Sequence, residues 1–195
     1  MSNNPGQIVV GSGGAIYIAP VGSGAPLPSG VQQPLTGVGY SEMGFISEDG
    51  IAASFGVEVA DIAAFQSLLP VRRVVTARNT EVSFTLRQWN VATFAVALGG
   101  GTYDLTPTGD YSFTPPANDA PLQELTAVIE WSDGQRKYRL VIPRAVVVED
   151  VETTIVRDAA ADLPVTLSVL SNDQGDSWYL VTNDPAFDLG ITPGS

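Results

Sequence analysis

The sequence predicts a mainly β protein, an antiparallel β-sandwich or barrel with one or two short flanking helices and an extended arm and loop. About seven or eight short stretches alternate apolar and polar residues, which is the period of a half-buried strand. The chain has 20 Gly and 14 Pro in 195 residues, above average usage and typical of many turns. Helical patterns are too few to alternate with the strands, so an antiparallel arrangement is favoured over a βαβ one.

The length of 195 residues predicts one domain with extensions. Residues 1–14 are expected to form a flexible N-terminal arm, because four glycines fall within residues 6–14 and glycine is costly to order. The β-sandwich domain is expected over residues 15–182 and includes an extended loop at 22–36, where Gly, Ser and Pro dominate. Residues 183–195 are expected to form a loop-like C-terminal tail.

In the first half of the chain, alternation and turn residues place three strands and one turn. The strands are expected at 16–21, 55–60 and 81–87, and the turn at 48–50. The second and third strands should each have one buried and one wetter face. Between them, Asp61 is expected to cap a short helix, with Ile62, Phe65 and Leu69 on one side and Pro70 at its end.

In the second half, Asn90 is expected to cap a helix that ends at Gly99-Gly100-Gly101. Residues 102–121 are polar and proline-rich and are expected to form an excursion from the domain. Asp133-Gly134 separates two alternating runs, which is a strong hairpin signal. The strands expected here lie at 125–131, 138–142, 146–156, 163–170 and 178–182.

Charge and residue usage exclude several classes of function. The formal net charge is −12, and all nine Lys and Arg residues lie between Arg72 and Arg157. Specific DNA binding needs a basic surface, and this chain has acidic ends instead. The absence of Cys and His removes disulfides, thiol catalysis and the usual general base. Neither a membrane-spanning run nor a secretion signal is expected, because no long apolar stretch is present.

The motifs that carry chemistry elsewhere are weak in this sequence, so no catalytic, cofactor or metal site is expected. Residues 172–176 place three oxygen-bearing side chains close together but lack the spacing and closing Glu of a calcium loop. Glu149, Asp150 and Glu152 could act as paired carboxylates, but neighbours in a strand point to opposite faces. Two interpretations from other classes stay open, an enzyme with an all-carboxylate site and a carbohydrate- or ligand-binding module. The second would use Trp89, Trp131 and Trp178.

The two basic pairs, Arg72-Arg73 and Arg136-Lys137, indicate contacts with carboxylates rather than with phosphates. Those carboxylates could belong to the same fold or to a neighbouring copy. The charged residues at the ends of the chain are all acidic, and the central segment carries both acidic and basic ones. If the ends of one copy contact the centre of the next, the same sequence supplies both the negative and the positive charges of that contact. Only 15% of the residues are charged, which suits a surface that other subunits partly cover.

Several segments in a fixed order resemble the major tail proteins, or tail tube proteins, of long-tailed bacteriophages, particularly those that infect actinobacteria. The resemblance is good over about residues 14–101 and holds in pattern beyond them. The matching segments are Gly14–Val21, Gly37–Tyr40, Gly44–Gly50, Val59–Gln66, Arg73–Thr76, Glu81–Leu86 and Asn90–Leu98.

The resemblance implies a structural virion protein that catalyses no reaction and needs no cofactor. Subunits of this kind form hexameric rings that stack into a tube, through which DNA leaves the particle. The implied partners are further copies of the chain, a tape-measure protein and terminator or baseplate components. The implied location is the virion tail, after assembly in the host cytoplasm. Another tail component, such as a tail terminator, is the neighbouring alternative.

The implied role also predicts where particular charged residues lie in the tube. Glu58, Glu81 and Glu130 lie on the polar faces of alternating strands and are expected to face the lumen. An acidic wall discourages the phosphate contacts that would stop DNA from sliding. Arg72, Arg73, Arg136 and Lys137 are expected to contact neighbouring subunits. The N-terminal arm and the 22–36 loop are expected to make contacts between subunits or rings.

Overall fold

The computed structural model describes residues 3–148 and 150–188 and shows a mainly antiparallel β fold, as predicted. The strands are β1 (Gly13–Pro20), β2 (Ser41–Glu42), β3 (Ile46–Ile62), β4 (Arg72–Leu86), β5 (Thr102–Leu105), β6 (Tyr111–Thr114), β7 (Leu125–Asp133), β8 (Arg136–Val147), β9 (Leu163–Val169) and β10 (Tyr179–Thr182). The helix α1 spans Val91–Ala97, and two single-turn 3-10 helices lie at Pro5–Gln7 and Pro185–Phe187.

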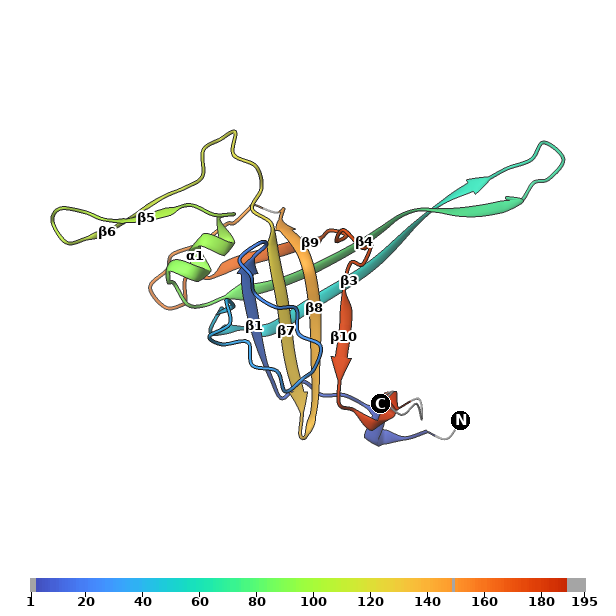
Figure 1. The fold of residues 1–195 in the computed structure, drawn as a ribbon. Helices are drawn as coiled ribbons and strands as arrows, with labels where there is room; N and C mark the ends of the chain where they lie inside the picture. Colours follow the sequence, from blue (N-terminus) through green and yellow to red (C-terminus); the bar gives the residue numbers. More distant parts are fainter. Residues whose placement is uncertain (1–2, 149, 189–195) are drawn as a thin grey trace.

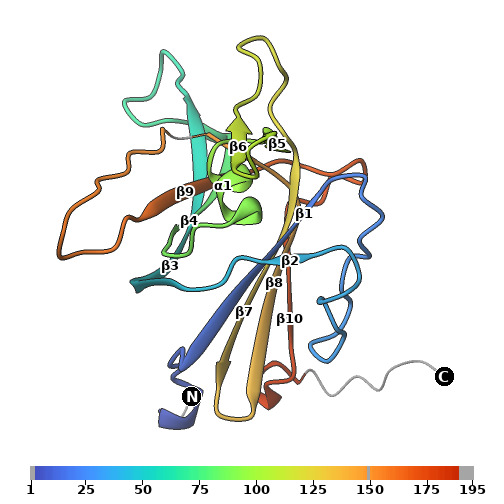
Figure 2. The same ribbon diagram turned by 90° about the vertical axis from the view of Figure 1, so that its left-hand side faces the viewer.

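Eight strands form one large sheet in the order β2-β1-β7-β8-β9-β4-β3, and β10 pairs with the beginning of β8. The end of β8 pairs instead with β9, so two strands share one edge of β8. The remaining strands, β5 and β6, form a separate hairpin. The sheet is strongly twisted, and β9, β4 and β3 cross the direction of β1, β7 and β8 (Figures 1 and 2).

The β7–β8 hairpin confirms the prediction made from Asp133-Gly134. Asp133 pairs with Arg136, which leaves a two-residue turn at Gly134-Gln135. Gly134 has a φ of 61°, a conformation that the tight turns of hairpins require and that glycine adopts without strain. The register that this turn fixes puts Ile129 beside Leu140 on one face and Val128 beside Val141 on the other.

The main core lies on the face of the sheet that carries Ile129 and Leu140. It combines buried side chains from β1, β4, β7, β8 and β9 with Met43 and with Val96 and Ala97 of α1. A smaller cluster lies on the opposite face, where Leu35 and Tyr40 pack against Val128 and Val141. The central strands β7 and β8 are therefore covered on both faces.

Helix α1 begins where the sequence predicts. The side chain of Asn90 accepts hydrogen bonds from the backbone nitrogens of Ala92 and Thr93 at 2.9 and 3.1 Å. The Thr93 hydroxyl accepts one in return from the Asn90 nitrogen at 3.0 Å, which completes a capping box. The helix ends before Gly99, whose φ of 71° suits a helix terminus.

The helix predicted after Asp61 is wrong. Residues 46–62 and 72–86 form two long paired strands, and residues 63–71 join them. Three positions on a helical stripe are a weak signal, whereas the β-branched residues on both sides of the loop, Ile62, Val74 and Val75, favour extended backbone. The turn expected at 48–50 lies within β3, as an irregularity in register between Ile46 and Ile51.

Two further expectations need correction. A separate strand at 146–156 is wrong, because β8 continues unbroken to Val147 and residues 150–156 are irregular. The pairing with β9 extends from Ala145 to Val147, and the Val148 nitrogen adds one bond to the Thr166 carbonyl at 3.3 Å. The excursion at 102–121 contains the β5–β6 hairpin, which has four residue pairs. The proline-rich composition of this segment argued against strands, so the hairpin was not predicted.

Candidate functional site

The most unusual feature of the molecule is the outer part of β3 and β4, which we call the β3–β4 arm (residues 55–80). The pairing of β4 with β9 stops at Glu81 and Ser168, so beyond that point β4 pairs only with β3. Figure 1 shows this two-stranded ribbon extending well away from the rest of the protein. An isolated two-stranded ribbon is marginally stable in water, so beyond Glu81 the arm depends on the β3–β4 pairing and on its anchorage in the sheet.

The two faces of the arm differ in chemistry. Register places Phe55, Val57, Val59 and Val75 on one face, where the first three are each 53% exposed. The opposite face carries Glu58, whose carboxylate accepts a hydrogen bond from the side chain of Asn79 at 2.7 Å, and it becomes apolar toward the tip, at Ile62 and Val74. The sequence predicted one buried and one wetter face for the strand at 55–60, but within this chain the face that carries Phe55, Val57 and Val59 is exposed.

The tip of the arm (residues 63–71) presents large apolar side chains to solvent. Phe65 and Leu68 are fully exposed, and Leu69 is 74% exposed. Within the tip, the Val71 nitrogen donates to the Ile62 carbonyl at 2.9 Å and the Ser67 hydroxyl donates to the Leu69 carbonyl at 2.8 Å. These bonds define the shape of the loop while its apolar side chains point outward.

An apolar groove lies at the base of the arm, on the same face as Phe55. Its volume is about 930 Å³, and its walls include Ile51, Ala53, Trp131, Trp178 and Leu180. The rings of Phe55 and Trp178 lie 4.8 Å apart and join β3 to the residue that precedes β10. Glu48 is the one charged residue among the described residues that line this groove.

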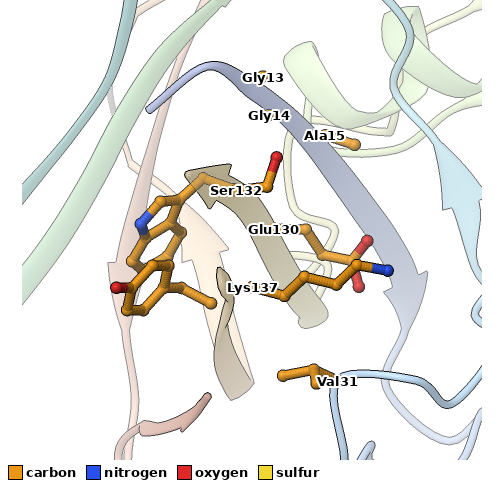
Figure 3. Close-up of a pocket in the computed structure, with 9 residues that line it drawn as sticks. Gly13, Gly14, Ala15, Val31, Glu130, Ser132 and Lys137 are labelled. Atoms are coloured by element: carbon orange, nitrogen blue, oxygen red, sulfur yellow. The ribbon is translucent and has the colours of Figure 1, made fainter. Parts of the chain in front are cut away.

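A second, smaller depression of about 310 Å³ lies where β1, β7 and β8 meet the 22–36 loop (Figure 3). Glu130 and Lys137 extend into it from neighbouring strands, with Ser132 and Val31 at its sides. Glu130 is not a free acid, because its carboxylate accepts a hydrogen bond from Nε of Arg139 at 2.6 Å. The depression therefore offers a lysine beside a carboxylate that is already neutralised.

Arg139 fastens the 22–36 loop to its own sheet. The side chain is only 4% exposed, and it donates to the carbonyls of Gly30 and Gln33 at 2.5 and 2.9 Å. The hydroxyl of Tyr179 donates to the carbonyl of Pro28 at 2.9 Å, and that of Tyr40 to the carbonyl of Pro26 at 3.2 Å. Burial raises the pKa of Tyr40 to about 12, so its hydroxyl stays protonated in this contact.

The four basic residues expected at subunit contacts differ in what they already bind. Arg73 pairs with Asp61 at 2.7 Å within the arm, and Arg136 pairs with Asp133 and lies 3.6 Å from Asp184. Arg136 also donates to the Gly6 carbonyl at 2.5 Å, which holds part of the N-terminal arm beside the β7–β8 turn. Arg72 and Lys137 form no ion pair with any residue in 3–148 or 150–188.

The other candidate motifs, Trp89, Trp131 and residues 172–176, make contacts that support the fold. Nε1 of Trp89 donates to the Ala161 carbonyl at 2.7 Å, and Trp131 stacks on Tyr138 with ring centroids 5.4 Å apart. The Asn172 side chain accepts from the nitrogens of Gln174 and Asp176 at 2.9 and 2.8 Å, as in a turn.

The proposed carboxylate cluster is only partly described. Asp150 and Glu152 lie in an irregular segment, whereas Glu149 is outside the described residues. Within the described part of the chain, no three metal-ligating side chains come close enough to hold an ion. The same part contains no helix that is long and apolar enough to cross a membrane.

Comparison with known protein families identifies the family of this chain. A family model described as phage tail tube protein matches residues 1–190. The chain belongs to the phage tail tube protein family. It is therefore a structural component of the virion tail and not an enzyme, as the resemblance implied. A search of curated proteins gives no match. The likeness to phages of actinobacteria stays a prediction.

Sequence reasoning missed the three features that stand out in the structure, namely the length of the arm, its apolar tip and the groove. A signal for the arm was present, because two runs rich in β-branched residues, 57–62 and 71–76, flank a short loop and fit one long hairpin. No local signal could have found the groove. Its walls come from segments as distant as Gly13 and Leu180.

Proposed function

We propose that this tail tube subunit forms hexameric rings that stack into a tube, and that DNA passes through its electronegative lumen. The observation that carries the proposal is the β3–β4 arm, whose apolar face and tip are exposed in the single chain. A soluble monomer rarely exposes such a continuous apolar surface, and a subunit covered by neighbours has no such constraint.

The edges of the sheet support a closed assembly. Among the described residues, β3 pairs only with β4, so its other edge offers unpaired backbone groups over the regular part from Ile51 to Ile62. Exposed strand edges pair readily with other chains, and a ring in which each edge meets the next subunit leaves none exposed. Six copies related by rotation would satisfy this requirement with one repeated contact.

The polar face of the arm supports an acidic lumen. Glu58 of the arm and Glu81, at the point where the arm leaves the main sheet, lie on one face of β3–β4 with Ser54, Asn79 and Ser83. We propose that this face lines the channel, where its negative charge repels the phosphates of DNA. Glu130 is proposed to line the channel without adding to its negative charge, because Arg139 forms an ion pair with it.

The remaining charges support contacts between copies. Arg72 and Lys137, which form no ion pair within the described residues, are proposed to bind carboxylates of neighbouring subunits. Arg73 and Arg136 already satisfy their charge within the chain, so a role between subunits would be secondary for them. A tape-measure protein and terminator or baseplate proteins are the further proposed partners, with assembly in the host cytoplasm.

Electron microscopy of the purified chain tests the assembly. Tubes with six-fold symmetry in cross-section are expected at high protein concentration or with a tail extract. A chain that remains monomeric at every concentration, and that is absent from the tails of the parent particle, would contradict the proposal.

A charge reversal tests the lumen. Tubes of the double variant Glu58→Lys, Glu81→Lys should retain short double-stranded DNA at low salt and release it as salt rises. The control with the same change in net charge is Asp104→Lys, Asp110→Lys, at exposed positions on and after β5, outside the arm. If the control retains DNA as strongly as the double variant, the polar face of the arm does not line the channel.

A further inference from the structure

The arm tip exposes large apolar side chains, and an apolar groove lies at the base of the same arm. We propose that the arm tip of one copy (residues 63–71) docks into the groove of the next copy, so that Phe65, Leu68 and Leu69 cover Phe55 and Trp178. This inference rests on the proposed tube, and it names the surfaces through which neighbouring copies bind.

The tip cannot occupy the groove of its own chain. The groove lies at the base of the arm, beside Ala53 and Phe55, and the paired strands continue outward to Ile62 and Arg72. The seven residue-to-residue steps of strand from Phe55 to Ile62 span about 23 Å at 3.3 Å per residue. The arm points away from the protein (Figure 1), so the groove can receive a tip only from another copy.

The two surfaces match in chemistry and size. The tip presents three large apolar side chains, and the groove is lined mainly by aliphatic and aromatic residues. A volume of about 930 Å³ lies at the upper end of the range in which proteins enclose bound molecules, so it can accept several side chains together. Trp178 and Phe55 provide the kind of aromatic surface that dominates protein interfaces.

The charges at the edges of the two surfaces are opposite. Arg72 directly follows the tip and forms no ion pair within the described residues, and residues 63–71 contain no acid. Glu48 lines the groove and Asp49 is exposed next to it. Docking therefore brings an unpaired guanidinium toward carboxylates, which favours the correct orientation of the tip.

The contact is of the head-to-tail kind. The tip and the groove are different surfaces of one chain, so every copy that inserts its tip still offers its own groove to another. Such contacts either close into a ring or continue along a helix. Either outcome builds a tube wall in which the length of the arm sets the spacing between copies.

Cysteine cross-linking tests the contact without background, because the chain contains no cysteine. Leu68→Cys protein mixed with Ala53→Cys protein should form a disulfide-linked dimer when tubes assemble under mild oxidation. The matched control replaces Ala53→Cys by Ala52→Cys, the adjacent residue, which lies on the opposite face of β3. All three positions are exposed, so the monomer should fold normally.

The outcomes separate this inference from the proposed function. Cross-links to position 53 and not to position 52 support docking. Tubes that form without the cross-link to position 53, or with equal cross-linking to both positions, overturn the docking and leave the tube intact. A failure to form tubes under any condition, together with no cross-link, overturns both.

Reversal of the two charges provides an independent test. Arg72→Glu and Glu48→Arg should each raise the protein concentration needed for tubes, and the double variant should restore it. Leu68→Asp should raise that concentration by at least about tenfold, while Leu105→Asp at the separate β5–β6 hairpin should not. A double variant that assembles no better than either single variant would argue against the contact between tip and groove.

Discussion

The β7–β8 pair and the β3–β4 arm are built from the same pattern, but only one of them is buried. Both are antiparallel hairpins in which one strand, β7 or β3, has apolar residues at alternate positions. Leu125, Ala127 and Val128 of β7 are at most 2% exposed, whereas Phe55, Val57 and Val59 of the arm are each 53% exposed. The alternation of apolar and polar residues therefore predicts that a strand has an apolar face. It does not predict whether the same chain or another chain buries that face.

The difference comes from what surrounds each hairpin. β7 has β1 on one side and β8 on the other, and β8 in turn pairs with β9 and β10. The main core covers one face of this pair, and the 22–36 loop, held by Arg139, helps to cover the other. The arm has no strand beyond its two and no covering layer among the described residues.

Removal of the arm should have the largest effect, because it should abolish tube assembly and leave the folding of the subunit unchanged. Gly56 and Asn79 pair across the ribbon, so an Asn-Gly turn between them can replace residues 57–78. The shortened protein should fold with an unchanged near-UV circular dichroism spectrum and form no tubes by electron microscopy. Tubes from the shortened chain would show that the arm is dispensable for assembly.

Truncation of a single apolar side chain should have very different effects in the two hairpins. Ile142→Ala in β8 removes a fully buried side chain and should lower the free energy of unfolding by about 2–5 kcal/mol. Val57→Ala in the arm should change it by less than about 0.5 kcal/mol in the monomer, because the site is exposed. Urea denaturation measures both, and similar losses would mean that the arm is already covered in solution.

Loss of Arg139 should make the β7–β8 pair more like the arm, because the loop on its second face loses its anchor. Arg139→Met leaves the carboxylate of Glu130 and the carbonyls of Gly30 and Gln33 without this donor. The free energy of unfolding should fall by roughly 3 kcal/mol. Limited proteolysis should then cut within residues 22–36 faster than in the unchanged protein. Equal cleavage rates would show that the loop is held by other contacts.

The smallest effect is expected at Asp184, which links the segment after β10 to the β7–β8 pair. The Tyr138 hydroxyl and the Ala186 nitrogen donate hydrogen bonds to this carboxylate, and they hold the pKa of Asp184 below its ordinary value. A lowered pKa means that the contact stabilises the fold above about pH 4 and that this gain is lost as pH falls through the lowered value.

Asp184→Asn should therefore lower the Tm at pH 7, and the difference from the unchanged protein should shrink in acid. Thermal unfolding followed by circular dichroism at several pH values measures this, with the exposed Asp104→Asn as control. A difference that stays constant down to low pH would mean that the charge of Asp184 does not matter.

The parts of the fold that were predictable are those encoded within a few residues. Asp133-Gly134 specified a hairpin because only a few residues suit its tight turn, and Asn90 specified a helix start because its side chain caps the free backbone nitrogens. The segment after Asp61 was predicted wrongly, because its weak helical stripe competes with a long strand partner that lies beyond the loop. Pairing over many residues outweighs local preference.

The candidate site was predictable only in part. Glu58 and Glu81 could be assigned to a polar strand face from alternation, and the structure puts both on one face of β3–β4. The pairing of Glu130 with Arg139 could not be inferred, because Arg139 also needs the carbonyls of a loop more than a hundred residues away. The groove was equally out of reach, since it exists only where β1, β3, β7, β8 and β10 converge.

The sequence alone determined the β class, the negative charge, the absence of thiol and imidazole chemistry, and the resemblance that the family match confirmed. These properties depend on composition and on short-range patterns. Only the tertiary structure decided which apolar faces the chain covers itself and which it leaves exposed. The physical reason is that burial depends on contacts between distant segments, which local patterns do not specify.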